Sequence, residues 1–120
     1  MKLGYRKAGL TLTIAFVSTF VAWAHAILLK STPEANEILD THNVPVALTF
    51  NSKIDQARST LTLEKPDHST SRLPIQVDSS SASKLLAGVL NLASGSYTLR
   101  WQVLAADGHI TRGEITFQVK

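Results

Sequence analysis

The chain has 120 residues, enough for one domain of ordinary size and too few for two domains with separate hydrophobic cores. Its formal net charge is +3, but from residue 25 onward nine basic residues balance nine acidic ones, which argues against a cationic surface that binds nucleic acid. The chain contains no cysteine, which excludes disulfides, thiolate metal sites, iron–sulfur clusters and thiol nucleophiles.

The beginning of the chain has the organisation of an export signal. Its first seven residues contain no acid and three basic residues, Lys2, Arg6 and Lys7. A mostly apolar stretch follows over residues 10–22, diluted by several threonines and a serine. A membrane anchor is the alternative, but a spanning helix needs about 20 predominantly apolar residues, more than this stretch supplies. The segment therefore predicts export to the periplasm.

The apolar stretch ends in a cleavage pattern. Small residues at Ala22 and Ala24 flank Trp23, which is the arrangement that signal peptidase recognises. We expect residues 1–24 to be removed as a signal peptide and residues 25–120 to remain as one periplasmic domain, not embedded in the membrane. Cleavage between Ala24 and His25 would leave His25 with a free α-amine beside its imidazole ring.

Seven segments after the cleavage point have the residue patterns of short strands. Four of them alternate apolar and polar residues with a period of two, and three are shorter apolar candidates. Turn-forming residues separate the segments from one another. The segments are 26–30, 46–50, 60–63, 73–77, 84–90, 97–103 and 114–119, with Pro45 expected at the first position of the second strand.

Seven short strands in a domain of this size predict an all-β fold: a small Ig-like antiparallel β-sandwich with Greek-key connections. Residues 33–39 are the one place for a helix, of one or two turns, because Pro-Glu opens helices well. The predicted core consists of Leu48, Phe50, Leu61, Leu63, Leu99, Trp101, Ile115, Phe117 and Val119.

The tripeptide Asp107-Gly108-His109 follows the strongest predicted strand. In an extended backbone, residues two apart point to the same side, so this carboxylate and imidazole would face a common point. The alternative is a simple Asp-Gly hairpin turn with an exposed histidine. The amine and ring of His25 can chelate a metal, and with Asp107 and His109 they would give three nitrogens and one oxygen. Such a set suits Cu(II), although spacing alone does not place His25 and Asp107 at the same end of the sandwich.

Several segments resemble the CopC-like family of periplasmic copper-binding proteins. These are the His-initiated start over 25–33, the strand over 46–50, and the segments 95–109 and 113–119 with their Trp and Asp-x-His spacing. The resemblance implies a β-sandwich with a Cu(II) site made by the terminal histidine, through amine and ring, an aspartate and a second histidine. Carried over to this chain, the ligands are His25, Asp107 and His109, with one Cu(II) ion per chain.

The chain departs from the pattern of that family at a few positions. Asn36 stands where glycine is frequent, which asparagine tolerates in a left-handed backbone. Asn51-Ser52-Lys53 replaces a more usual Ser-Glu, and Ala105-Ala106 lacks a frequent serine before the Asp-x-His. None of these changes removes a predicted ligand, but the hydrogen bonds that support the ligands are expected to differ.

The sequence thus predicts a periplasmic Cu(II)-binding protein of copper homeostasis or resistance, a monomer and not an enzyme, which sequesters copper or delivers it. The resemblance suggests an inner-membrane copper transporter as the recipient. Protons compete for the amine and imidazole nitrogens, so copper affinity should fall as pH falls. Met1, the one methionine, leaves with the signal, so no thioether site for Cu(I) is expected.

Two other functions fit parts of the same pattern. An N-terminal histidine chelate also resembles the copper centre of polysaccharide monooxygenases, which would make the chain a copper-dependent oxidative enzyme. If the Asp107-Gly108-His109 segment is only a turn, the chain would be a metal-free exported Ig-like interaction module. The remaining histidines, His42 and His68, lie in predicted loops and are expected to be exposed to solvent, where either could add weak surface affinity for metal.

Overall fold

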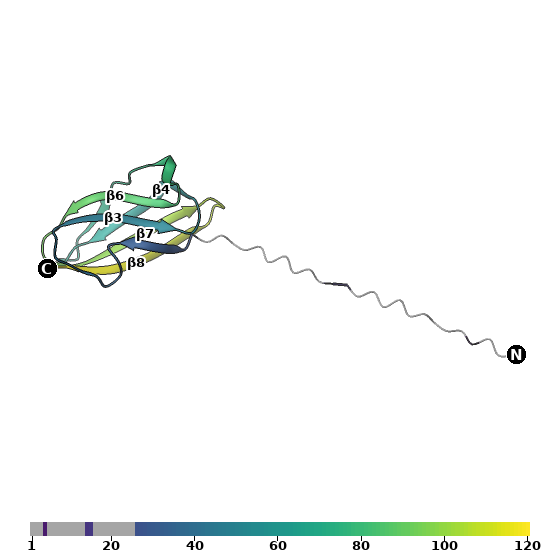
Figure 1. Ribbon diagram of the computed structural model, residues 1–120, viewed down its shortest axis with the longest axis horizontal. Helices are drawn as coiled ribbons and strands as arrows, with labels where there is room; N and C mark the ends of the chain where they lie inside the picture. The colour runs from purple at the N-terminus through teal and green to yellow at the C-terminus, as the bar shows by residue number, and fades with distance from the viewer. Residues whose placement is uncertain (1–3, 5–13, 16–25) are drawn as a thin grey trace.

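The computed structural model describes residues 4, 14–15 and 26–120, and the domain from residue 26 onward is a sandwich of two β-sheets (Figure 1). The predicted all-β fold is therefore confirmed. The predicted signal peptide and its cleavage site lie mostly outside the described residues. Within the described residues, no helix is long and apolar enough to cross a membrane. The elements are β1 (Leu28–Thr32), β2 (Ile38–Leu39), β3 (Asn43–Phe50), β4 (Ile54–Glu64), β5 (Thr70–Leu73), the 3₁₀ turn η1 (Ser79–Ser81), β6 (Lys84–Asn91), β7 (Gly95–Ala105) and β8 (Ile110–Val119).

The two sheets are built from strands that are not neighbours in sequence. One sheet has three strands in the order β1-β3-β6, and the other has five in the order β2-β8-β7-β4-β5. All pairs are antiparallel except β2 with β8, which is a short parallel pair. The β7–β8 hairpin forms the longest continuous ladder, in which Gly95 pairs with Val119 at one end and Leu104 pairs with Ile110 at the other.

The helix considered for residues 33–39 does not form. The backbone amide of Asn36 instead donates to the carbonyl of Thr116 on β8, at 2.7 Å, and Ile38–Leu39 pair with the end of β8. Asn36 has a φ of 64°, the left-handed conformation expected of it. Hydrogen bonds to a distant strand therefore replace the local ones that a helix would use.

Two strand boundaries also differ from the sequence-based expectation. The strand predicted over 73–77 lies earlier, because β5 ends at Leu73, and Pro74 has no amide hydrogen with which to continue the ladder. The strand expected to begin at Pro45 instead begins at Asn43. At Pro45, β3 pairs only with β6, since β1 reaches no further than Ala47, and a missing amide hydrogen is tolerated on such an open side.

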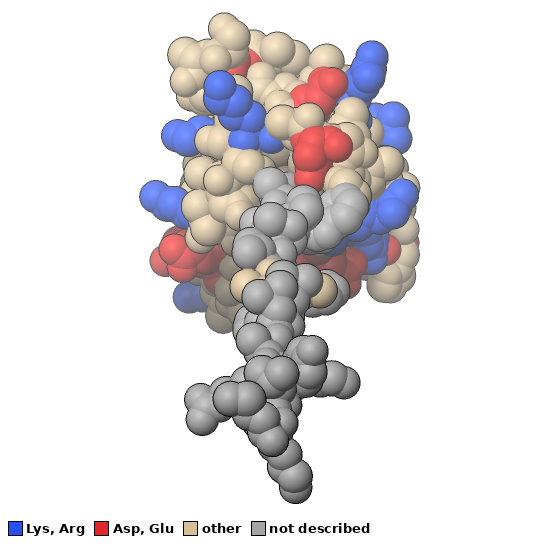
Figure 2. Space-filling view, turned by 90° about the vertical axis from the view of Figure 1, so that its right-hand side faces the viewer, with Lys and Arg blue, Asp and Glu red and all other residues tan. Residues whose placement is uncertain are grey.

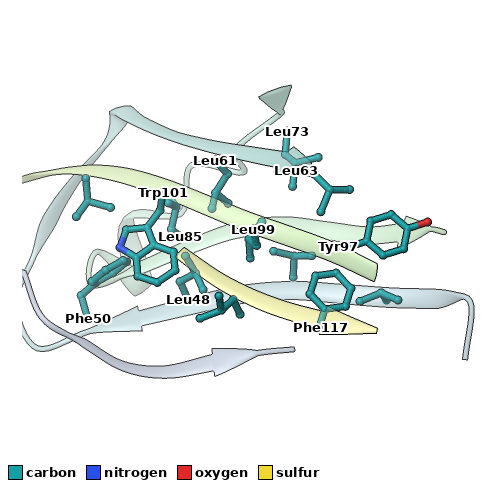
Figure 3. Packing of buried hydrophobic residues seen from close by; sticks show 14 of the residues in the cluster. Leu48, Phe50, Leu61, Leu63, Leu73, Leu85, Tyr97, Leu99, Trp101 and Phe117 are labelled. Carbon is teal, nitrogen blue, oxygen red and sulfur yellow. The ribbon is translucent and has the colours of Figure 1, made fainter. Parts of the chain in front are cut away.

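The core lies between the sheets (Figure 3), and all nine residues predicted for it are buried. The rings of Trp101 and Phe50 meet edge to face, with centroids 6.5 Å apart. The rings of Tyr97 and Phe117 stack at 5.5 Å, toward the opposite end of the core in this view. The Phe50–Trp101 pair thus joins the two sheets, whereas Tyr97 and Phe117 are cross-strand partners within the five-stranded sheet, and β7 contributes a ring to each pair.

Candidate metal centre

The predicted ligands Asp107 and His109 lie in the turn of the β7–β8 hairpin. Between Ala105 and His109 the hairpin closes with two backbone hydrogen bonds, from the Ala105 amide to the His109 carbonyl at 2.8 Å and from the Gly108 amide to the Ala105 carbonyl at 2.9 Å. Gly108 has a φ of 88°, a conformation that glycine adopts without strain. The hairpin turn predicted from Asp107-Gly108 is therefore present in the structure.

The same turn also brings the carboxylate and the imidazole together. Asp107 Oδ2 lies 3.1 Å from His109 Nδ1, and Asp107 Oδ1 accepts the backbone amide of His109 at 3.0 Å. An extended backbone was expected to direct both side chains to the same side. Asp107 and His109 instead lie beyond the end of β7, where the backbone turns. An Asx turn, in which an aspartate side chain binds the amide two residues later, brings the two groups together.

The beginning of the domain lies at this same end of the sandwich. The β3–β4 turn, residues 51–53, connects the two regions. On one side, the amide of Ile27 donates to Asn51 Oδ1 at 2.8 Å, and the amide of Asn51 donates to the Ile27 carbonyl at 2.9 Å. On the other side, the amide of Ala106 donates to the Lys53 carbonyl at 3.2 Å. Figure 1 shows the start of β1 and the β7–β8 hairpin together at the right-hand end of the domain.

Two further polar groups are buried in the segments that form this end. Ser52 Oγ, in the β3–β4 turn, and Thr111 Oγ1, two residues after His109, are shielded from solvent and make no hydrogen bond within the described residues. In the view onto this end (Figure 2), acidic side chains lie just above the centre of the face, and Lys and Arg side chains lie around its rim. The β3–β4 turn and the start of β8 thus each bury one hydroxyl oxygen at this end of the domain.

The turn brings together two potential metal donors, the Asp107 carboxylate and the His109 imidazole, and a protein metal site needs more than two ligands. Over residues 26–120 and the three described residues before them, no group of three or more His, Asp or Glu side chains could hold a metal ion. The third predicted ligand, His25, lies outside the described residues. The chemistry of the pair fits Cu(II), because an imidazole nitrogen and a carboxylate oxygen are among the ligands that Cu(II) prefers. Both side chains remain partly accessible, at 40% for His109 and 30% for Asp107.

The other histidines lie elsewhere, and both are exposed as expected. His42 Nδ1 is 2.7 Å from the carbonyl of Leu92, just before β3 begins, at the end of the domain opposite the hairpin. His68 lies in the β4–β5 turn with a φ of 66°. The structure does not bring either of them to the Asp107–His109 turn.

Two open grooves lie on the five-stranded sheet rather than at the hairpin. One, of about 680 Å³, lies beside β4 and the segment after β5, between Gln56 and Val77. The other, of about 640 Å³, crosses the outer face between Arg72 and Arg112. Neither groove is lined by Asp107 or His109. The candidate ligands therefore lie at an accessible turn outside these two grooves.

A known domain family matches this chain. The CopC domain family matches residues 28–120, which is most of the chain. The chain belongs to the CopC domain family. Protein YobA of Escherichia coli (strain K12) is 31% identical over 117 residues, which cover 96% of this chain and 94% of that protein. The YobA protein of Shigella flexneri matches with the same identity and coverage.

Solved structures share the fold. CopC from Methylosinus trichosporium OB3b superposes with a TM-score of 0.75 at 25% identity, over 80% of this chain and 94% of that one. PcoC, a methionine-rich copper resistance protein from Escherichia coli, superposes with a TM-score of 0.62 at 22% identity, over 81% of this chain and all of that one. Because PcoC is only 22% identical in sequence, its similarity to this chain shows the fold alone.

The site contains one residue that the sequence patterns did not single out. Asn51 appeared only as a departure from the family pattern, yet its side chain and backbone both bind Ile27. The two residues are 24 positions apart, and no local pattern marks an asparagine in a turn as the partner of a distant strand.

Proposed function

We propose that this CopC-family chain binds one Cu(II) ion in the periplasm through His25, Asp107 and His109. His25 would supply its α-amine and imidazole nitrogens, His109 a further nitrogen, and Asp107 a carboxylate oxygen. The ion is cargo that the protein holds or hands to a membrane copper transporter, in the service of copper homeostasis or resistance. The fold shared with CopC and with a copper resistance protein supports this proposal.

One observation carries the proposal furthest. Ile27, two residues after His25, and Ala106, the neighbour of Asp107, both hydrogen-bond to the same short β3–β4 turn. Spacing in the sequence left it open whether the start of the domain and the Asp-x-His segment lie at the same end. The shared turn supports a site in which donors from the chain start and from the hairpin converge on one ion.

A change of one residue at the chain start tests the proposal. We would titrate Cu(II), with a competing chelator, into protein that begins at His25 and into protein with one alanine added before His25. The added residue converts the α-amine into an amide while leaving the imidazole and the whole sandwich in place. We expect copper affinity to fall by more than about tenfold, or about 1.4 kcal/mol.

The matched control adds an alanine after Lys120, at the far end of the domain, where it should leave copper affinity unchanged. If the protein beginning at His25 and the extended protein bind Cu(II) equally weakly, the proposed terminal chelate is wrong.

A further inference from the structure

We propose that Asn51 is a positioning residue for copper: it fixes the start of the chain so that His25 meets the Asp107–His109 turn. The inference rests on the proposed function and concerns a residue that is not itself a ligand. Asn51 binds Ile27 twice, through Oδ1 to the Ile27 amide at 2.8 Å and through its own amide to the Ile27 carbonyl at 2.9 Å. This pair of bonds fixes both the position and the direction of the backbone at Ile27.

Covalent geometry transmits this constraint to His25. Successive α-carbons are 3.8 Å apart, so the α-carbon of residue 25 lies within about 8 Å of that of Ile27. The residue between them, Ala26, is buried, with 1% of its surface exposed, and packs in the core. The described backbone next to residue 25 is thus anchored at both Ala26 and Ile27. An anchored segment lowers the cost of orienting a ligand that it carries.

The same turn fixes the other half of the site independently of the Asn51 side chain. The Lys53 carbonyl accepts the amide of Ala106, and Ile54 pairs with Ala105 at the first position of β4. These contacts involve backbone atoms only. Removing the Asn51 side chain therefore frees the Ile27 amide while the turn keeps its contact with the hairpin that carries Asp107.

The exposure of Asn51 separates positioning from simple stability. The Asn51 side chain is exposed, and its hydrogen bond to Ile27 lies at the surface. A hydrogen bond in such a place contributes modestly to folding, and no core contact is lost when the side chain is shortened. The main consequence of its removal should therefore be seen in the geometry and affinity of bound copper.

The test uses Asn51→Ala in protein that begins at His25, with inorganic Cu(II) as the probe. We expect copper affinity to fall about tenfold or more, the range found when residues that support metal ligands are removed. The electron paramagnetic resonance spectrum of the bound Cu(II) should shift or broaden, because the amine and ring of His25 are no longer held in one orientation. Hydrogen exchange of the Ile27 amide should become faster in the metal-free protein.

Two further variants separate positioning from a general loss of structure. Asn51→Asp retains an oxygen that accepts from the Ile27 amide, so it should restore slow exchange at Ile27 and bring copper affinity back toward the original value. Asn43→Ala removes another exposed asparagine, at the opposite end of β3, and should change neither copper affinity nor the spectrum.

The outcomes distinguish this inference from the proposed function. If the unaltered protein binds Cu(II) in a way that depends on its free amine, and Asn51→Ala has the same affinity and spectrum, the positioning role is overturned and the proposed function stands. If the unaltered protein shows no such binding, the proposed function and this inference both fail.

Discussion

At the scale of single residues, one turn motif occurs three times with different consequences. In each case an aspartate Oδ1 accepts the backbone amide two residues later at 3.0 Å. In two of the turns the third residue is serine, whose hydroxyl also donates to Oδ1 at 2.6 Å. In the third turn that residue is His109, and the other carboxylate oxygen faces its ring. The three turns are 67–69, 78–80 and 107–109. With histidine in place of serine as the third residue, the same turn sets an imidazole beside the carboxylate, and these are the two groups proposed as metal donors.

This comparison separates the turn from the candidate site in Asp107→Asn. The amide oxygen of asparagine can still accept the His109 amide, so the free energy of unfolding should change by no more than about 0.5 kcal/mol. The anionic donor is lost, so Cu(II) affinity should fall by more than about tenfold. Urea unfolding of the metal-free protein and copper titration give the two quantities.

Asp67→Asn is the matched control, because it alters the same motif at the opposite end of β4 and should leave copper affinity unchanged. Copper affinity in Asp107→Asn equal to that of the unaltered protein would show that this carboxylate is not a ligand.

At the scale of elements, the β7–β8 hairpin combines a long ladder with a close side-chain contact. Trp101 and Gly113 face each other across the two strands. The indole ring of Trp101 fills the space where a side chain at position 113 would lie. A Cβ atom there would be 2.6 Å from Trp101 Cε2, a distance that real Cβ atoms essentially never show. Gly113 therefore allows the indole ring of Trp101 to pack against β8.

Gly113→Ala should consequently destabilise the hairpin. Overpacking of a well-filled core costs about 1–3 kcal/mol, and we expect a loss of that size in the free energy of unfolding measured with urea. Repeating the substitution in Trp101→Phe, whose smaller ring leaves room for a methyl group, should cost less than half as much. Equal costs in the two backgrounds would show that the contact with the indole is not responsible.

At the scale of the whole molecule, charge is balanced from residue 25 onward, and hydrogen bonds in two exposed turns contribute to its response to acid. The side-chain hydrogen bond from Ser69, followed by the bond from its backbone amide, lowers the pKa of Asp67 below the usual range. Bonds from Ser80 lower the pKa of Asp78 in the same way. A carboxyl whose pKa is lower in the folded state stabilises the fold above its unfolded pKa, of about 3.9, and loses that contribution as pH falls through the folded value.

We therefore expect stability to decrease as pH falls below about 4. The combined variant Asp67→Asn with Asp78→Asn should show a shallower decrease over this range, measured by urea unfolding at a series of pH values. Ser69→Ala with Ser80→Ala, which removes the hydroxyl donors and keeps the carboxyls, should also make the decrease shallower. A slope unchanged in both variants would contradict the view that these hydrogen bonds favour the charged carboxylates.

The parts of the fold that the sequence predicted are those that depend on short-range patterns. Alternating residues along β7 and β8 predicted the strands and which face of each is buried, because neighbouring side chains of a strand point to opposite faces. The Asp-Gly signal predicted the hairpin turn. The same reasoning failed at residues 33–39, where a hydrogen bond from Asn36 to β8 and the β2–β8 pairing replace the local bonds of a helix.

By itself, the sequence determined the all-β class, the nine core residues predicted above, and the proximity of Asp107 and His109, since an Asx turn requires only an aspartate and the two residues after it. Only the tertiary structure decided that the start of the domain lies at the same end of the sandwich as this turn. That placement depends on β1 pairing with β3, on β4 pairing with β7, and on the β3–β4 turn bonding to both neighbours. Contacts between residues so far apart in sequence arise when two sheets close over one core, which a pattern with a period of two does not specify.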